Sequence, residues 1–592
     1  MNKPSMPAHF KFDFVNQEGV PERIIFDQPQ QTVVAYSLHE VREAMIEIQK
    51  EVNKGAYAAG YISYEAAPAF EPKMTVKANS RLPLLYFGIY DKPVIIEQPA
   101  EYTGSVKEMH WTSPTSQKEY YRCIQAIKDH ISAGETYQVN YTLRLRSQLN
   151  GDYGDGYALY EQLRAAQQGN YSAYLDLGKF HILSVSPELF FALHDGKYIT
   201  TRPMKGTIRR GRFLEEDINN KHILMNSEKD KAENLMIVDL LRNDLGKIAK
   251  SGTVSVTDLF AVEKYPTVFQ MTSTITAELQ EVRKESLFYD LFQALFPCGS
   301  ITGAPKLKTM EIIDTLEQEP REMYCGTIGY LTPGGNSIFN VAIRTVIIDT
   351  EKGTAEYGVG GGITWGSENS SEYEEAIAKA AVLHEPVVPF ELMETIRLEH
   401  QQYWLLDLHI DRLEQSASYF DIPFNREYIT QALESYALTL LDQEVYRINL
   451  FLDKYGQHRL MASPFQSDSV VIMQAILAQQ PIKITDKFMY HKTTHRSTYN
   501  NHKEFLRNRN MEVLLWNENE EITEFTIGNI VVKHHGEWWT PPVSSGLLRG
   551  VHRRHLLKQG KIREKVLYVK DIPQFEEIWL INSLRGWVQI VI

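Results

Sequence analysis

Two lysines stand in sequence contexts in which an amine could act as a catalyst. Lys205 follows a strand-like run in RPMKGT, residues 202–207, and Lys492 lies in HKTTHR, residues 491–496. The pKa of a lysine is normally near ~10.4, but burial or a neighbouring cation lowers it until the amine can act as a nucleophile or a base. The alternative for each is a solvated surface lysine, so the motifs around them must decide.

Three glutamates indicate a site for a hard cation. Glu233 lies in the amphipathic segment KAENLMIVDLLRNDLG, residues 231–246, and Glu372 and Glu375 lie in SEYEEA. Glu372 and Glu375 are three positions apart, so they share one face of a helix. Carboxylates are the ligands that Mg²⁺ prefers. Two helices that carry them could hold one Mg²⁺ and leave room for a substrate carboxylate, whereas the alternative is a set of solvated acidic residues.

Groups that could bind an anion lie further along the chain. AIRT contributes Arg344, and GVGGGI, residues 358–363, is a glycine run that lets backbone N–H groups approach an anion. FPCGSITGAPK, residues 296–306, lacks the spacing of a phosphate-binding loop, because Pro305 intervenes and Leu307 follows the lysine. We therefore predict no nucleotide site in that segment.

The elements that must position these residues divide into two sets. Residues 1–385 interleave strand-rich runs with long helices, which we expect at residues 118–135 and 215–244, and this mixture is typical of a layered α+β fold. A helix over residues 371–385 should end at EPVVP, because proline cannot continue it. We therefore predict one domain over residues 1–385 and a second over 386–592, which starts with strand-like runs in FELMETIRL and YWLLDLHI.

Composition limits the class of protein. The chain has 592 residues, 43% of them hydrophobic, and a net charge of −13 with a pI of about 5.8. This acidic balance disfavours nucleic-acid and anionic-membrane partners. We find neither a signal peptide nor a run of the ~20 apolar residues that span a bilayer. We therefore expect a soluble, cytoplasmic protein with reduced cysteines.

Seven motifs of the first part follow one another in the order SPELFF, RPMKGT, AENLMIVDLLRND, GSITGAPK, AIRT, GVGGGIT and SEYEEA. Together they resemble the chorismate-utilising enzymes, which include anthranilate synthase component I and aminodeoxychorismate synthase component I. The resemblance covers roughly residues 50–385. It implies an α+β fold, a large sandwich of two antiparallel sheets with flanking helices, and a site for chorismate and Mg²⁺.

The same resemblance implies roles for single residues. Lys205 stands where the aminodeoxychorismate branch has a lysine that attacks C2 of chorismate, and Glu188 looks like an acid/base residue near the ring hydroxyl. Gln270 replaces a histidine that anthranilate synthases tie to pyruvate loss, which favours a synthase that stops at the amino adduct. The implied Mg²⁺ ligands are Glu233 and Glu375, with Glu372 beside them. The implied substrate contacts are Gly206, Thr207, Arg344, Gly360, Gly361 and Gly362.

The nitrogen must come from elsewhere. A class I glutaminase needs a cysteine on a nucleophile elbow with glycine on both sides, and Cys123, Cys298 and Cys325 have no such setting. We therefore expect ammonia from a separate glutamine amidotransferase subunit, or free ammonia.

The second part carries METIR, HIDRLEQSA, HKTTHR, ITEFTIGNI, PPVSSGLLRGVHRR and INSLRG. Together these resemble the fold-type IV enzymes of pyridoxal 5′-phosphate (PLP), which include aminodeoxychorismate lyase and branched-chain aminotransferase. The resemblance implies a smaller α+β domain of two subdomains, and a homodimer through this domain is compatible with it. It also implies that Lys492 binds PLP covalently, that Glu524 pairs with the pyridine nitrogen, and that Arg412 holds the phosphate. The backbone of Val551 and His552, with Ser583, would complete the phosphate site.

The two resemblances lead to one hypothesis. The first domain aminates chorismate at C4, and the second eliminates pyruvate to give p-aminobenzoate, a step of folate synthesis. One alternative is an anthranilate synthase fused to an aminotransferase-like domain. Another is a second domain that is not catalytic and serves for dimerisation or for docking of the glutaminase.

Overall fold

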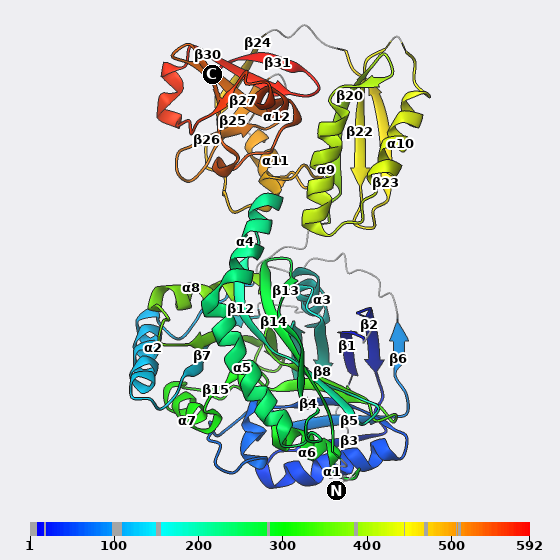
Figure 1. Cartoon of the computed structure of the whole chain (residues 1–592), viewed down its shortest axis with the longest axis vertical. Coiled ribbons are helices and arrows are strands. Elements are labelled where there is room, and N and C mark those ends of the chain that lie inside the picture. Colours follow the sequence, from blue (N-terminus) through cyan, green and yellow to red (C-terminus); the bar gives the residue numbers. More distant parts are fainter. Residues whose placement is uncertain are drawn as a thin grey trace. The chain divides into compact units, whose positions relative to one another are not determined.

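The structure is a computed structural model that describes residues 9–16, 19–96, 109–149, 156–280, 284–383, 389–442, 444–466, 472–504, 506 and 511–592. The chain forms two compact units, shown in Figure 1. The first unit contains residues 1–209 and 221–387, and the second contains 210–220 and 388–592. The predicted domain boundary at 385/386 lies outside the described residues.

Two antiparallel sheets form the first unit, as the resemblance implies. Over the described residues one sheet has nine strands in the order β15-β7-β19-β18-β9-β8-β1-β2-β6. Its strands, in that order, are Gly303–Ala304, Gln138–Gln148, Thr354–Ile363, Thr345–Asp349, Phe180–Ser186, Tyr171–Asp176, His9–Val15, Pro21–Phe26 and Val94–Ile96.

The second sheet has ten strands over the described residues, in the order β12-β14-β11-β10-β17-β16-β4-β5-β3, with β13 (Ser255–Lys264) paired to β14. The ordered strands are Met204–Arg209, Val268–Glu278, Tyr198–Arg202, Leu189–His194, Ser337–Val341, Thr327–Leu331, Tyr57–Ile62, Leu85–Tyr90 and Gln31–Ala35.

Aromatic side chains join the two sheets face to face. Strand β1 alternates half-buried and buried positions, as a strand with one face on the core must. Its buried residue Phe10 packs edge-on against Tyr86 and Tyr90 of β5, with ring centroids 6.1 and 6.4 Å apart. Such contacts between inner faces are how two sheets form a sandwich.

Helices cover the sandwich, as the first unit in Figure 1 shows. Helix α1 (Leu38–Asn53) packs with α6 (Leu287–Leu295), α2 (Gln117–Ser132) packs with α8 (Asn369–Lys379), and α3 (Gly156–Gln167) packs on β9. Helix α7 (Lys306–Leu316) lies against β7, and α5 (Glu228–Gly246) lies against β12 and β14. In the described part of the chain, no helix has both the length and the apolar character that a membrane span requires.

The single long helix expected over residues 215–244 is wrong. The structure has α4 (Leu214–Asn226) and α5, separated at Ser227. The Ser227 side chain accepts a hydrogen bond from the backbone N–H of Asp230, and this N-cap begins a new helix. The cap therefore fixes where α5 begins, and with it the position of Glu233 in that helix.

The second unit has two sheets, and Figure 1 shows the strands and helices of each. The first sheet contains β21 (Gln402–Tyr403), β20 (Leu392–Glu399), β22 (Tyr446–Leu452) and β23 (His458–Pro464) in that order. It packs against α9 (Leu406–Phe420) and α10 (Arg426–Ala437). The strand expected over YWLLDLHI is therefore largely wrong: only Tyr403 lies in a strand, and α9 starts at Leu406. In α9, Ile410, Leu413 and Ala417 recur at helical spacing and are buried.

The second sheet of this unit is mixed. Over the described residues its order is β26-β25-β24-β31-β30-β27-β28-β29. Its strands, in that order, are Ile522–Phe525, Met511–Trp516, Ile472–Leu477, Gly586–Val591, Glu577–Asn582, Gly528–His534, Glu537–Thr540 and Arg563–Glu564. The unit also includes α11 (Ser497–Lys503) and α12 (Val551–Lys558), which contacts β30 and α9.

Candidate active sites

The first candidate site forms where β12 meets α5. Lys205 lies on β12, and its Nζ is 3.5 Å from Oε2 of Glu233 on α5. Each side chain is 15% exposed, so the amine is close to solvent but largely enclosed. Gly206 has a φ of 98°, and a Cβ there would meet Cβ of Asp230 at 2.9 Å. Glycine at this position therefore lets β12 approach α5 closely enough to pair Lys205 with Glu233.

The glycine run of β19 faces the same amine. A Cβ on Gly362 would lie 2.3 Å from Lys205 Nζ and 2.4 Å from Nε2 of Gln138, a residue of β7. Gln138 is fully buried, and neither polar atom of its side chain has a hydrogen-bond partner within the described residues. A buried amide without partners is costly, and this one points at the candidate nucleophile. Sequence reasoning missed Gln138, because nothing in the spacing of ETYQVN relates it to RPMKGT.

Glu188, directly before β10, is a buried carboxyl group near Lys205. Oγ of Ser300 donates to its Oε1 at 2.7 Å, and Sγ of Cys298 lies 3.2 Å from that hydroxyl oxygen. Burial raises the pKa of Glu188 to about 7, although the Ser300 hydrogen bond and the positive charge of Lys205 favour the carboxylate. A carboxyl group with that pKa can exchange a proton near neutral pH.

The predicted metal ligands lie around the same strand. Glu372 and Glu375 share the face of α8 that covers β19: a Cβ on Gly361 would be 3.6 Å from Oε2 of Glu372 and 4.0 Å from Oε1 of Glu375. Burial, followed by repulsion from Glu375, raises the pKa of Glu372. Ser367 donates to Glu372 at 2.6 Å, and Lys379 pairs with Glu375 at 2.8 Å.

Among the described residues, Glu233 forms ion pairs with Lys205 and Lys229. The positive charge of Lys379, followed by those of Lys205 and Lys229, lowers the pKa of Glu375, so Glu233 and Glu375 share two neighbouring lysines. Within the described ranges, no three acidic, histidine or cysteine side chains are arranged tightly enough to hold a metal ion. The donor chemistry nevertheless fits Mg²⁺, because Glu372 and Glu375 offer oxygen ligands and a cation would relieve their mutual repulsion.

The predicted substrate contacts fall into two groups. Arg344 is half-buried, and Oε1 of the buried residue Gln167 accepts a hydrogen bond from its Nη1. The described part of the chain gives Arg344 no carboxylate partner, and burial lowers its pKa, so this cation suits an anionic ligand. Thr207 donates to Oε1 of Gln270 at 2.9 Å, and Gln270 Nε2 donates to the Gly206 carbonyl at 2.9 Å.

The backbone glycines are only partly available. Lys379 Nζ donates to the Gly360 carbonyl at 2.9 Å, and Gly360, Gly361 and Gly362 pair across the sheet with residues 140–142 of β7. The structure therefore brings Lys205, Glu188 and the glycine run together with Gln138. It places Arg344 directly before β18, the strand that pairs with β19 in the sheet that holds the glycines.

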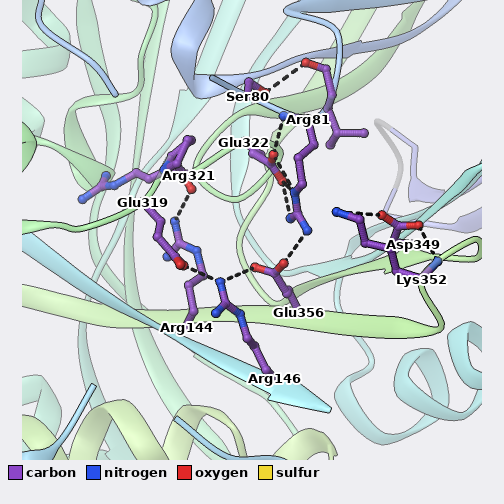
Figure 2. A network of polar contacts seen from close by, with 12 residues as sticks. Ser80, Arg81, Arg144, Arg146, Glu319, Arg321, Glu322, Asp349, Lys352 and Glu356 are labelled. Atoms are coloured by element: carbon purple, nitrogen blue, oxygen red, sulfur yellow. Dashed lines mark hydrogen bonds and ion pairs between the residues drawn. The ribbon is translucent and has the colours of Figure 1, made fainter. Parts of the chain in front are cut away.

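A cavity of about 820 Å³ in the first unit lies at the other end of β7 and β19. Figure 2 shows that its charged groups face one another. Arg81 pairs with Glu322 at 2.6 Å and with Glu356 at 2.5 Å, and Arg146 pairs with Glu319 at 2.6 Å. Because these charges already compensate one another, we place the chemistry at Lys205 and not in this cavity.

The second candidate site is built around Lys492. Its side chain is half-buried, and this burial, with the positive charges of Arg412 and Arg496, lowers the pKa of the amine to about 8. The described residues place no carboxylate within ion-pair distance of Nζ. The backbone is fixed, because the Lys492 carbonyl accepts a hydrogen bond from the N–H of Met393 at 2.9 Å. An amine that is partly neutral near physiological pH is what imine formation with an aldehyde requires.

Glu524 on β26 is held by three donors. Tyr499 donates to Oε1 at 2.7 Å, the N–H of Leu548 donates to Oε1 at 3.1 Å, and Asn529 donates to Oε2 at 3.0 Å. Burial raises the pKa of Glu524 to about 7 against these hydrogen bonds. Three donors fix the orientation of the carboxyl group, as a partner of a protonated ring nitrogen would need.

Arg412 on α9 is part of a buried triad. Its Nε and Nη2 bind both oxygens of Glu394 at 2.8 and 2.5 Å, and Nη1 donates to the Arg549 carbonyl at 3.3 Å. His409 Nδ1 lies 2.6 Å from the same carboxylate, and its buried Nε2 has no partner within the described residues. Sequence reasoning missed Glu394 and His409, although METIR and HIDRLEQSA contain them.

The expected phosphate site lies at the start of α12. Val551 and His552 begin this helix after Gly550, and the described residues supply no side-chain cap to its first N–H groups. Nδ1 of His552 lies 3.1 Å from the Asn582 carbonyl, next to Ser583, which is buried. Free N–H groups at a helix N-terminus favour an anion. With Arg412 and the unpartnered amine of Lys492, the residues present fit PLP.

The two regions match two families. Residues 11–385 match the family described as chorismate binding enzyme, and residues 391–592 match the family described as amino-transferase class IV. The first match covers more than half of the chain. The chain therefore belongs to the chorismate binding enzymes, and it carries an aminotransferase class IV region in the same polypeptide.

Relatives and a solved structure agree with this assignment. The chain is 37% identical over 354 residues to aminodeoxychorismate synthase component 1 of Klebsiella aerogenes, covering 55% of this chain and 76% of the relative. It is 43% identical over 269 residues to the protein of the same name from Escherichia coli K12, covering 45% and 57%. The fold is also similar to the crystal structure of anthranilate synthase component I from Streptococcus pneumoniae, with a TM-score of 0.51 and 23% sequence identity. The similar region covers 65% of this chain and 93% of that one, and it confirms the fold of that region.

Proposed function

We propose that the first unit converts chorismate and ammonia into 4-amino-4-deoxychorismate, and that the second eliminates pyruvate from this product to give p-aminobenzoate. The observation that carries the proposal is the position of Lys205. Its amine lies among Glu188, Gln138 and the glycine strand, where a bound ring would meet it. The names of the relatives from Klebsiella aerogenes and Escherichia coli support the C4 branch.

In the first reaction Lys205 acts as the nucleophile and Glu188 as the acid. Nζ of Lys205 forms a bond to C2 of chorismate, while Glu188 gives a proton to the C4 hydroxyl, which leaves as water. Ammonia then forms a bond at C4, and the C2–N bond to Lys205 breaks and restores the amine. Glu188, with a pKa of about 7, is protonated often enough at neutral pH to act as the acid.

Charge complementarity supports the binding of an anion at this site. Arg344 would pair with a carboxylate of the substrate, because its guanidinium meets only the neutral amide of Gln167 among the described residues. Glu375 and Glu233, with Glu372, would hold Mg²⁺, which would neutralise a second carboxylate. Gln270 would keep Gly206 and Thr207 in place beside the ring.

The source of ammonia is part of the proposal. Cys123, Cys298 and Cys325 are all buried, and Cys298 belongs to the hydrogen-bonded chain behind Glu188. None is exposed as the nucleophile of a glutaminase must be, so we propose a separate glutaminase subunit. The designation "component 1" of the relatives supports this.

The second reaction uses the amine of Lys492, whose pKa is lowered to about 8. PLP, when bound, withdraws electrons from the carbon that carries the substrate amine. Lys492 would bind the cofactor, and its neutral amine then accepts the proton that leaves C4. Glu524 would hold the pyridine nitrogen, and Arg412 with the start of α12 would hold the phosphate. Loss of pyruvate gives an aromatic ring, which makes the reaction favourable.

Product analysis tests the proposal. The purified chain is supplied with chorismate, ammonia and Mg²⁺, with and without PLP, and products are separated by chromatography and mass spectrometry. We expect 4-amino-4-deoxychorismate without PLP, and p-aminobenzoate with pyruvate when PLP is present. Anthranilate as the main product would instead assign the chain to the C2 branch.

A further inference from the structure

A short segment of the first family's region belongs to the second unit. Residues 210–220 lie within the match to the chorismate binding enzymes, between Lys205 on β12 and Glu233 on α5. Yet they belong to the compact unit that holds Lys492, and the unit boundary falls inside α4. The family matches give no sign of this, because residues 210–220 and the residues on either side all lie in the region that matches the chorismate binding enzymes.

The contacts of the segment converge on the residue before Lys492. His491 is buried, and burial lowers its pKa to about 3, so its ring is neutral. Its Nε2 lies 3.2 Å from the Arg212 carbonyl. Because a carbonyl only accepts, Nε2 must carry the proton. Nδ1 therefore accepts from Ser416 of α9 at 3.0 Å. The segment thus fixes the tautomer and the orientation of the ring adjacent to Lys492.

Two further contacts hold the same peptide. Nη1 of Arg212 donates to the hydroxyl of Tyr490 at 3.0 Å, and the ring of Phe213 packs against the Tyr490 ring with centroids 5.6 Å apart. Both residues that precede Lys492 are therefore bound by residues 212 and 213. Because Tyr490 and His491 are buried and held by these contacts, they restrict the motion of the adjacent residue, Lys492.

The segment is itself anchored on α9, the helix of Arg412. The Tyr419 hydroxyl donates to the Gly211 carbonyl at 2.7 Å in a buried contact, and Nη2 of Arg210 donates to the Tyr419 carbonyl at 2.9 Å. Further along, Glu215 pairs with Arg549 at 2.5 Å. Arg549 is the residue whose carbonyl Arg412 binds. The segment therefore contacts the residues that precede Lys492 and also Arg549, whose carbonyl binds Arg412.

We propose that residues 210–220 complete the PLP unit and that Arg212 is a positioning residue for Lys492, acting through Tyr490 and His491. The inference rests on the proposed PLP site. The segment touches no reacting atom, so its effect is on the orientation of the 489–493 peptide and on retention of the cofactor. The PLP unit thus depends on residues from the part of the chain that matches the other family.

The test compares two single variants of the full chain, one in the 210–220 segment and one in the helix α9 that binds it. Arg212→Ala removes the link to Tyr490, and Tyr419→Phe removes only the hydroxyl that binds the Gly211 carbonyl, so the second variant should fold normally. Hydrogen–deuterium exchange of the apo protein reports on the 486–496 peptide without any cofactor. We expect faster exchange there in both variants. PLP titration, followed by visible absorption, should show about 2- to 10-fold weaker retention, the effect of one hydrogen bond.

Arg563→Ala is the matched control, because Arg563 lies in the same unit and its ion-pair partner among the described residues is the exposed Glu537. It should change neither exchange at 486–496 nor PLP retention. Unchanged exchange in both Arg212→Ala and Tyr419→Phe would overturn the inference, and so would an equal change in the control. If the unmodified chain bound no PLP, the proposed second activity would fail, while the exchange of the apo protein would still decide the positioning role.

Discussion

Oγ of Ser300 lies 2.7 Å from Oε1 of Glu188 and donates a hydrogen bond to it. The two residues are 112 positions apart: Ser300 lies in a short 3₁₀ helix, Gly299–Ile301, and Glu188 lies on the turn between β9 and β10. This donor stabilises the carboxylate, whereas burial stabilises the carboxylic acid, and burial prevails to leave a pKa of about 7. The balance between these two effects decides at which pH Glu188 can act as an acid.

Ser300→Ala should move that balance in a defined direction. Without the donor, the carboxylate loses stabilisation and the pKa of Glu188 rises above about 7. The protonated acid then persists to higher pH, so the decline of kcat/KM on the alkaline side should shift upward. Glu188→Gln should remove this limb and lower the rate by about 10²-fold or more. pH profiles of ammonia-dependent amination measure both effects, and an unshifted profile in Ser300→Ala would argue against Glu188 as the acid.

Lys205→Ala should abolish 4-amino-4-deoxychorismate formation while leaving the fold intact. Lys205 contacts Glu233 at 3.5 Å and is not part of the hydrophobic core, so circular dichroism should be unchanged. Lys197→Ala is the control, because Lys197 is an exposed lysine of the same unit, paired with Glu278. Normal product formation by Lys205→Ala would show that the amine does not attack the ring.

Glu233→Gln and Glu375→Gln should each weaken the dependence of amination on Mg²⁺, since each removes one charged oxygen ligand. The concentration of Mg²⁺ at half-maximal rate should rise. Glu374→Gln alters the neighbouring exposed residue of α8 and should behave like the unmodified protein. A Mg²⁺ dependence unchanged in both Glu233→Gln and Glu375→Gln would place the ion elsewhere.

Capture of PLP by the apo protein should accelerate as pH rises through about 8. The lowered pKa of Lys492 means that its amine loses its proton near that value, and only the neutral amine attacks the aldehyde. A solvated lysine would instead require pH values near ~10.4. Stopped-flow absorption measures the rate. Lys492→Ala should show no covalent capture, release no p-aminobenzoate, and accumulate the amino intermediate made by the first unit.

Arg412→Ala should affect stability as well as cofactor binding. It leaves Glu394 buried with His409 as its remaining partner among the recorded ion pairs, and breaking a buried pair from one side costs about 3–5 kcal/mol. The apo form should therefore melt at a lower temperature, and excess PLP should restore only part of the activity. Adding Glu394→Gln removes the stranded charge and should recover some of the lost stability. Equal melting temperatures for Arg412→Ala and the unmodified apo protein would contradict the triad.

Local sequence patterns determine much of what this protein is. Glu372 and Glu375 share a face of α8 because a helix brings positions three apart together. Lys379 pairs with Glu375 because it follows four positions later in SEYEEAIAK. The order of the motifs along the chain likewise indicates both families. These features depend on helical periodicity or on short motifs, which a single sequence carries.

Tertiary structure alone decided which distant residues meet. Gln138 faces Lys205 because β7 and β19 are neighbours in one sheet while β12 lies in the other, and no spacing along the chain encodes that approach. Residues 210–220 belong with Lys492 although their sequence neighbours belong with Lys205. The physical reason is common to both cases: burial and side-chain packing act between groups brought together in space, and the free energy of those contacts overrides the order in which the chain presents them.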